Sequence, residues 1–453
     1  MTTPRHDDLL LRIAGHRFAA GVLRRLGLPT PVALQRADGP WRGDELAGRQ
    51  LVVASLGEAA DLLALTGTLQ QLGAQLQTSA EGRIDALLVD ARQLGHPGQL
   101  HSLYALFASA LPRLAPLGRI VLLGPQPGPA GSPQRHATAH ALGGLVRSLG
   151  KEVGRRGAAI NQLAVPAAGS AALAPCVAFL LSRRSGFIAG QTLQLAATTA
   201  SEGLRGWSPG ALAGQTAVVT GAARGIGHAI ARRLAAEGAR VLCVDVAAAL
   251  SPLQALAAAI DGQALVLDVS SAEAGAQLAA AVQAMGGADI VVHNAGITRD
   301  RTLARMSAAE WDAVIAVNLE AVLALDAALD DAGGWRHGAR TVCLSSINGL
   351  AGAAGQTNYA AAKAGLVGYV QARAQLLAPH GGAINAVAPG FIETAMTAHL
   401  PWQVALAGRR LSALGQGGQP ADVAEAVTLL ALPLHGAVNG QLLRVCGQNF
   451  VGA

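Results

Sequence analysis

The stretch TAVVTGAARGIGHAIARRLA, residues 216–235, places an apolar run, a glycine-rich turn and an amphipathic helical pattern in direct succession. A buried strand that leads through such a turn into a helix is the context of a dinucleotide-binding fingerprint. Gly221, Gly225 and Gly227 have no side chains, so the backbone can approach a pyrophosphate closely. The backbone amides at the start of the helix, near Ile226, can face that pyrophosphate with the positive end of the helix dipole. The stretch therefore predicts a nucleotide site in an α/β domain.

Short strand-like runs alternate with longer helical patterns along the whole chain, in two successive copies. Such alternation predicts parallel sheets with helices on both faces. A chain of 453 residues is too long for a single hydrophobic core, so we expect two domains. We predict a degenerate Rossmann or flavodoxin-like α/β domain over residues 1–205 and a Rossmann domain with a doubly wound parallel sheet over residues 206–453. Residues 198–215 have the Gly, Ser and Pro content of a linker. The predicted strands are 51–56, 85–90 and 119–124 in the first copy, and 216–221, 240–245, 289–294, 340–345 and 440–445 in the second, with a helix over 138–153 in the first.

The two copies can be aligned without gaps over residues 119–146 and 340–367. In that register Thr138 stands where the second copy has Tyr359, and Leu142 where it has Lys363. Either a duplication or two sheets of similar pattern would produce this match, and the sequence leaves both open. In both cases the first copy lacks the nucleotide and catalytic motifs of the second.

Charge and cysteine content exclude several classes of protein. The formal net charge is +6, and no basic run is interleaved with aromatic residues, so we expect no nucleic-acid binding. The four cysteines are far apart and form no C-x-x-C pair, which fits a reducing cytoplasm. No histidine pattern such as H-E-x-x-H is present, and we predict no metal site. No apolar run is long enough for membrane insertion, and the charged N-terminus is not a secretory signal.

Asp245 ends the strand that follows the glycine-rich turn, about 20 residues further on, where a carboxylate can accept hydrogen bonds from both ribose hydroxyls. The same carboxylate would repel the 2′-phosphate of NADP(H). Arg224 in the turn has the opposite effect, because a guanidinium can hold that phosphate. We expect the repulsion to prevail, so NAD(H) is favoured and NADP(H) is the alternative.

The stretch NYAAAKAG, residues 358–365, places Tyr359 and Lys363 one helical turn apart on the same face. A phenol has a pKa near 10 and is a poor acid at neutral pH, whereas a nearby ammonium favours the phenolate. An exposed stripe of polar residues would show the same spacing. With the glycine-rich turn upstream, the pair points to acid–base chemistry.

These motifs, with NAG at 294–296, Ser346 and PGFIET at 389–394, resemble the short-chain dehydrogenase/reductase family. The segments GQTNYAAAKAGLVG and INAVAPGFIETAMT are similar to sequences of its 3-oxoacyl-thioester reductase branch. The whole chain resembles the long, high-molecular-weight FabG-type 3-oxoacyl-ACP/CoA reductases. His293 departs from the branch, which usually carries Asn at that position.

The resemblance implies a role for each matching residue. Tyr359 would protonate the carbonyl oxygen, Ser346 would hydrogen bond that oxygen, Lys363 would lower the pKa of Tyr359 and hold the ribose, and Asn318 would anchor a water for proton relay. The implied cofactor contacts are Asp268 and Val269 at the adenine, Asn294, Ala295 and Gly296 at the cofactor floor, and Pro389, Gly390, Ile392 and Thr394 at the nicotinamide.

The implied substrate is a 3-oxoacyl thioester of CoA or acyl-carrier protein, and the implied assembly is a homo-oligomer, with a dimer favoured over a tetramer. Residues 395–420 would form a lid, in which Arg409 and Arg410 either meet phosphates or lie on a solvated face. Two alternatives stay open: a dehydrogenase of another secondary alcohol or ketone, and a dinucleotide-binding scaffold without turnover.

Overall fold

The computed structural model describes residues 8–16, 18, 21–22, 25, 30–57, 61–77, 82–128, 131–198, 208–434 and 436–450. Half of the predicted linker, residues 199–207, lies outside them. The chain forms two compact units. The first comprises Met1–Ser208, Phe391–Gly418 and Val445–Phe450, and the second comprises Pro209–Gly390, Gln419–Arg444 and Val451–Ala453.

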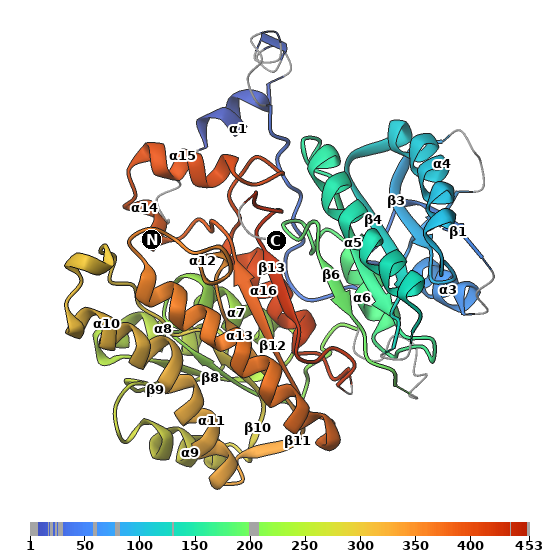
Figure 1. The fold of residues 1–453 in the computed structure, drawn as a ribbon. Coiled ribbons are helices and arrows are strands. Elements are labelled where there is room, and N and C mark those ends of the chain that lie inside the picture. The colour runs from blue at the N-terminus through green and yellow to red at the C-terminus, as the bar shows by residue number, and fades with distance from the viewer. Residues whose placement is uncertain are drawn as a thin grey trace. The chain divides into compact units, whose positions relative to one another are not determined.

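The first unit is built on a six-stranded sheet in the order β2-β1-β3-β4-β5-β6, and all its neighbouring strands are parallel (Figure 1). The order reverses between β1 and β3, as in flavodoxin-like folds. The strands are β1 (Gln50–Ser55), β2 (Gln75–Leu76), β3 (Ile84–Asp90), β4 (Leu114–Pro125), β5 (Ala159–Val165) and β6 (Thr192–Gln194).

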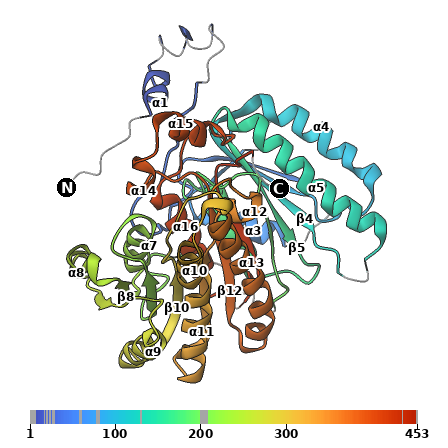
Figure 2. The ribbon, with the colours of Figure 1, turned by 60° about the vertical axis from the view of Figure 1, so that its left-hand side comes forward.

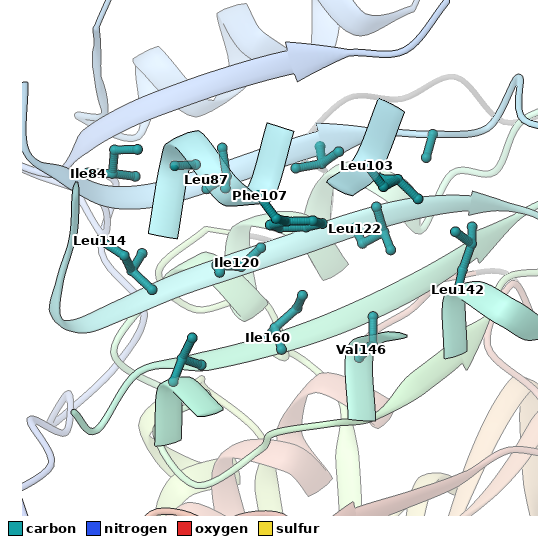
Figure 3. Close-up of a cluster of buried hydrophobic side chains, with 14 of the residues drawn as sticks. Ile84, Leu87, Leu103, Phe107, Leu114, Ile120, Leu122, Leu142, Val146 and Ile160 are labelled. Atoms are coloured by element: carbon teal, nitrogen blue, oxygen red, sulfur yellow. The ribbon is translucent and has the colours of Figure 1, made fainter. Parts of the chain in front are cut away.

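Helices cover both faces of this sheet. Figure 3 shows Leu103 and Phe107 of α4 and Leu142 and Val146 of α5 packed on alternate strand residues such as Ile120. Fully buried residues of α6 contact β4 and β5 outside that cluster, which places α6 on the other face. The helices are α1 (Leu9–Ala14), α3 (Leu62–Gln71), α4 (His101–Ala110), α5 (Pro133–Gly154) and α6 (Leu173–Leu181), with short 3-10 turns η1 (Pro97–Leu100) and η2 (Leu111–Arg113).

The second unit has a seven-stranded sheet in the order β13-β12-β11-β10-β7-β8-β9. This is the Rossmann arrangement, in which the order reverses between β7 and β10, and folds of this kind bind ligands at the carboxyl ends of the strands beside such a reversal. The predicted α/β fold class is confirmed. The strands are β7 (Thr216–Thr220), β8 (Arg240–Asp245), β9 (Gln263–Val266), β10 (Ala288–His293), β11 (Trp335–Leu344), β12 (Ala383–Pro389) and β13 (Leu442–Val445).

Helices α9, α11 and α13 pack on one face of this sheet (Figures 1 and 2). Helices α7 and α16 pack against each other, α7 also contacts β7 and β8, and α16 also contacts β11 and β12. The helices of the second unit are α7 (Gly225–Ala236), α8 (Leu250–Ala259), α9 (Ala274–Ala284), α10 (Ala308–Ile315), α11 (Ala321–Asp331), α12 (Ile347–Ala351), α13 (Thr357–Leu377) and α16 (Pro420–Leu430). Its shorter turns are η3 (Ala247–Ala249), η4 (Leu303–Arg305), the π-helical η5 (Ala316–Glu320) and η6 (Ala378–His380).

Residues 391–418, which carry α14 (Ala395–Ala398) and α15 (Trp402–Arg410), belong to the first unit. The side chain of Gln416 donates to the Val32 carbonyl at 2.8 Å, and Arg410 pairs with Asp8 at 2.5 Å. The ring of Phe187 lies against Gly418 so closely that a Cβ there would stand 2.5 Å from it. A segment distant in sequence is thus an integral part of this unit.

Both units repeat the same local contacts. In each, a buried asparagine of the strand next to an edge strand donates its side-chain amide to a carbonyl of a later loop. The same side chain accepts from the backbone amide three residues beyond that carbonyl. The sets are Asn161 with Ile188 and Gln191, and Asn385 with Val438 and Gln441. An aspartate also accepts from the first residues of a neighbouring strand in each unit, in the pairs Gln50 with Asp85 and Thr216 with Asp289. These repeats favour duplication over coincidence.

Some predicted elements needed correction. The helix predicted to begin at Thr138 begins at Pro133, because Ser132 caps it by accepting from the backbone amide of Arg135 at 3.3 Å. The pattern also missed β2, β5, β6, β9 and β12. β2 and β6 are only two and three residues long, too short to show a period.

Candidate active site

The glycine-rich turn has the geometry of a dinucleotide cradle. Gly221 and Gly225 have positive φ angles of 65° and 60°, which L side chains rarely adopt. A Cβ at Gly227 would lie 2.1 Å from the Gly221 carbonyl oxygen, so this position has no room for a side chain. The N-terminus of α7 follows directly at Gly225, with Arg224 exposed just before it. The backbone therefore fits a pyrophosphate lying against the helix N-terminus.

Asp245 is half-buried at the carboxyl end of β8, and backbone amides hold its carboxylate. Oδ2 accepts from the Ala223 amide at 2.9 Å and Oδ1 accepts from the Val246 amide at 2.8 Å. The carboxylate is thus fixed beside the glycine-rich turn, as an acceptor for ribose hydroxyls must be.

The loop after β10 is joined to the end of β7. Asn294 donates through Nδ2 to the carbonyls of Thr220 and Gly221, at 3.0 Å each. The Thr220 hydroxyl accepts from the amides of Asn294 and Ala295, also at 3.0 Å. These contacts bring Asn294, Ala295 and Gly221 together at the point where the strand order reverses. Thr220 was not predicted, because a single threonine at a strand end carries no distinctive sequence signal.

Asn318 is fully buried in the π-helical turn η5, a type of irregularity that is frequent at functional sites. Its Nδ2 donates to the carbonyls of Ile297 and Val314, at 2.9 Å each, and its Oδ1 has no hydrogen-bond partner among the described residues. A Cβ at Gly296 would stand 2.5 Å from that Oδ1 and 3.4 Å from Nζ of Lys363. Asn318, Gly296 and Lys363 are therefore neighbours.

Ser346, Tyr359 and Lys363 also meet. Ser346 caps α12, where its hydroxyl accepts from the Asn348 amide at 3.2 Å, and it lies near enough to Tyr359 to lower the pKa of the phenol. Nζ of Lys363 lies 5.6 Å from the centroid of the Tyr359 ring and donates to the Leu344 carbonyl at 2.8 Å. Gly349 permits this approach, because a Cβ there would lie 2.9 Å from the backbone of α13.

Burial controls the ionisation of this group. It raises the pKa of Tyr359 above its ordinary value, the Ser346 hydrogen bond lowers that pKa in part, and Asp300 raises it further. Burial also lowers the pKa of Lys363 to about 8. Lys363 is not among the groups that shift the Tyr359 pKa in this structure, where burial dominates, so the predicted lowering of that pKa by Lys363 stays a prediction.

The remaining predicted residues lie in several places. Asp268 is exposed, accepts from the Ser270 hydroxyl at 2.7 Å and has a lowered pKa because of that bond, and Val269 beside it is buried. Pro389 ends β12 and Gly390 follows it. Ile392 and Thr394 belong to the first unit, where Thr394 caps α14.

Three residues near the site were not predicted. The Ser345 hydroxyl donates to the Lys363 carbonyl at 2.7 Å, and the Leu344 carbonyl accepts from Lys363 Nζ. Buried Asn358 accepts from the Tyr359 amide at 2.8 Å and so fixes the start of α13. The adjacency of Asn358 to Tyr359 was the only available signal.

Arg409 and Arg410, for which phosphate binding and a solvated face were both open, form ion pairs within the first unit. Arg409 is buried and pairs with Glu393 at 2.6 Å, and Arg410 pairs with Asp8. Neither lies on a solvated face.

Comparison with known proteins identifies the family. Residues 221–447 match the family described as enoyl-(acyl carrier protein) reductase, which belongs to the short-chain dehydrogenases/reductases. The chain is a short-chain dehydrogenase/reductase. It is therefore an oxidoreductase of a family that takes a nicotinamide cofactor.

Several members of this family are similar to it. A 3-oxoacyl-[acyl-carrier-protein] reductase FabG of Vibrio cholerae is 40% identical over 237 residues, which are 52% of this chain and 97% of that protein. A (3R)-3-hydroxyacyl-CoA dehydrogenase of Mus musculus is 41% identical over 248 residues, 52% of this chain and 96% of that protein. The crystal structure of a dehydrogenase/reductase from Sinorhizobium meliloti 1021 is 37% identical, covers 52% of this chain and 95% of its own, and has a TM-score of 0.49.

The family match in this short-chain dehydrogenase/reductase begins at residue 221, after the six strands of the first unit's sheet. None of the helices in the described part of the chain is long and apolar enough to cross a membrane.

Proposed function

We propose that this protein reduces 3-oxoacyl thioesters to 3-hydroxyacyl thioesters with NADH. The observation that carries the proposal is the meeting of Ser346, Tyr359 and Lys363 in the unit that holds the glycine cradle. Relatives that act on 3-oxoacyl-[acyl-carrier-protein] and on 3-hydroxyacyl-CoA share about 40% of their residues with this chain, which supports the substrate class.

In this proposal the bound nicotinamide supplies the hydride. Tyr359 donates its phenolic proton to the substrate carbonyl oxygen, and Ser346 donates a hydrogen bond to the same oxygen as negative charge develops there. Lys363 holds the ribose and favours the phenolate that Tyr359 becomes. Oδ1 of Asn318, which has no partner in the described part of the chain and lies next to Lys363, would hold a water that resupplies the proton.

The preference for NADH rests on Asp245. Backbone amides hold its carboxylate at the end of β8, so it cannot swing away from a 2′-phosphate without losing two hydrogen bonds. Arg224 is exposed beside the turn and is the group that would favour NADPH.

The test is the initial rate of NADH or NADPH oxidation with acetoacetyl-CoA, followed at the nicotinamide absorbance band. Rapid oxidation of NADH is expected. A strong preference for NADPH would overturn the cofactor assignment, and a rate on other ketones but not on thioesters would favour the alternative dehydrogenase. Cofactor binding without turnover on any substrate would favour the scaffold.

We further propose that the enzyme is a homo-oligomer, with a dimer favoured, and that it works in the cytoplasm on CoA or carrier-protein thioesters. All four cysteines are buried and free, which suits a reducing compartment. For residues 1–205 we propose a structural role. At the carboxyl end of β3, where the strand order of the first unit reverses, Arg92 pairs with Asp90 and with Asp61 at 2.7 Å each. These ion pairs lie at the edge of the sheet where a fold of this kind would bind a ligand, which supports a structural role.

A further inference from the structure

His293, the residue that departs from the family pattern, contacts a buried carboxylate. Its Nε2 lies 2.9 Å from Oδ1 of Asp326, and the two side chains are 2% and 0% exposed. Nδ1 of His293 has no hydrogen-bond partner in the described part of the chain. Because an ionised carboxylate can only accept, Nε2 of His293 is the donor in this hydrogen bond.

Asp326, on α11, contacts side chains of two other elements, β10 and α13. Its other oxygen accepts from the Tyr369 hydroxyl at 2.6 Å and lies 3.4 Å from Nε of Arg373. Burial raises the pKa of Asp326, but His293, Tyr369 and Arg373 outweigh that effect and leave the pKa below its ordinary value. The carboxylate is therefore ionised and fully partnered, as a buried charge must be.

Each partner of Asp326 belongs to an element that carries a proposed site residue. His293 directly precedes Asn294 at the end of β10. Tyr369 and Arg373 lie on α13, the helix of Tyr359 and Lys363. Asp326 itself lies on α11, which continues from the π-helical turn that contains Asn318.

We propose that Asp326 is a positioning residue that, through His293 and Tyr369, sets the cofactor loop after β10 and helix α13 in register with each other. The inference rests on the proposed function, because it deepens the account of the same site. Loss of the His293 contact would remove the side-chain link between the end of β10 and α11, while Thr220 and Gly221 would still hold Asn294 and Ala295 from the β7 side.

The test compares His293→Gln with His293→Leu. Glutamine presents an N–H near the position of Nε2 and can donate to Asp326, whereas leucine fills similar space without a donor. His293→Leu should weaken NADH binding and slow acetoacetyl-CoA reduction at saturating substrates by about tenfold each, and His293→Gln should stay within about twofold of the wild type.

Tyr369→Phe, a milder change on the other side of Asp326, should slow turnover more than it weakens NADH binding. Its effect should combine less than additively with that of His293→Leu.

The control is Asp330→Asn, which removes the outer carboxylate that pairs with Arg373 at 2.8 Å and lies outside the proposed route. Equal NADH affinity and turnover for the Gln and Leu variants would overturn the inference. So would losses that merely follow the melting temperature across all variants, the control included. If the wild type turned over no 3-oxoacyl thioester, the proposed function would fall, while the NADH affinities of the Gln and Leu variants would still decide the positioning role.

Discussion

Lys363 holds its ammonium 5.6 Å from the centroid of the Tyr359 ring while donating to the Leu344 carbonyl at 2.8 Å. The lysine is buried, and among the described residues its ammonium makes that one hydrogen bond, which leaves two of its three donors for other partners. A buried ammonium with spare donors is costly to keep unless it serves a ligand. The geometry thus links the stability of the second unit to its chemistry.

Replacing Tyr359 by Phe removes the proposed acid and little else. Turnover of acetoacetyl-CoA should fall by about a thousandfold, because general acid catalysis supplies a factor of this order. NADH affinity, measured by cofactor fluorescence, should be nearly unchanged. Tyr104→Phe, at an exposed position on α4, is the matched control and should behave as the wild type. Wild-type turnover by Tyr359→Phe would remove this residue from the mechanism.

Lys363 should make stability depend on pH. Its pKa is about 8 in the folded protein against a reference value of 10.5, so between those values the unfolded chain binds more protons and stability rises with pH. Below pH 8 the buried charge costs on the order of 3 kcal/mol. Lys363→Met should therefore raise the melting temperature most at pH 7, and its advantage should shrink by pH 9.5. An advantage that did not change over this range would contradict the lowered pKa.

Ser346→Ala should alter both rate and pH dependence. Loss of the hydrogen bond to the developing oxyanion should lower turnover by about a hundredfold. Because that hydroxyl also lowers the pKa of Tyr359, its removal should raise this pKa. In the reverse direction, where Tyr359 must act as a base, the rate with 3-hydroxybutyryl-CoA and NAD+ should then rise with pH at higher values than in the wild type. Ser251→Ala, on the exposed face of α8, should leave both rate and profile unchanged.

The sequence predicted the second unit better than the first for a physical reason. Strands such as β8 are continuous apolar runs between turn residues, and the glycines of the cofactor turn are required by positive φ angles and close contacts that no other residue allows. By contrast, nothing in the sequence indicates that Phe391–Gly418 belongs to the first unit, because partners such as Val32 and Gln416 are hundreds of residues apart. The roles of Thr220 and Asp326 likewise depend on contacts between distant elements.

Asp245→Asn should weaken the discrimination between cofactors. The amide can accept from one of the two backbone amides but carries no charge to repel a 2′-phosphate. The ratio of kcat/KM for NADH to that for NADPH should fall by about tenfold or more, since loss of the charge removes on the order of 1.4 kcal/mol. Arg224→Ala should shift the same ratio in the opposite direction. An unchanged ratio in Asp245→Asn would show that another group selects the cofactor.

The packing of Gly418 against Phe187 provides a test of how firmly Phe391–Gly418 is built into the first unit. A Cβ at Gly418 would stand 2.5 Å from the ring of Phe187 and 2.6 Å from the side chain of Ile392. Since Phe187 is buried and its ring cannot bend, Gly418→Ala should destabilise the protein by about 1–3 kcal/mol, seen as a lower midpoint of thermal unfolding. Gly144→Ala, on α5 with nothing within 4 Å of the added Cβ, is the control and should be neutral or slightly stabilising.

In a Phe187→Leu background the smaller side chain leaves room for the methyl group, so Gly418→Ala should cost less there than in the wild type. Equal costs in the two backgrounds would mean that the segment moves away from Phe187 rather than being held against it.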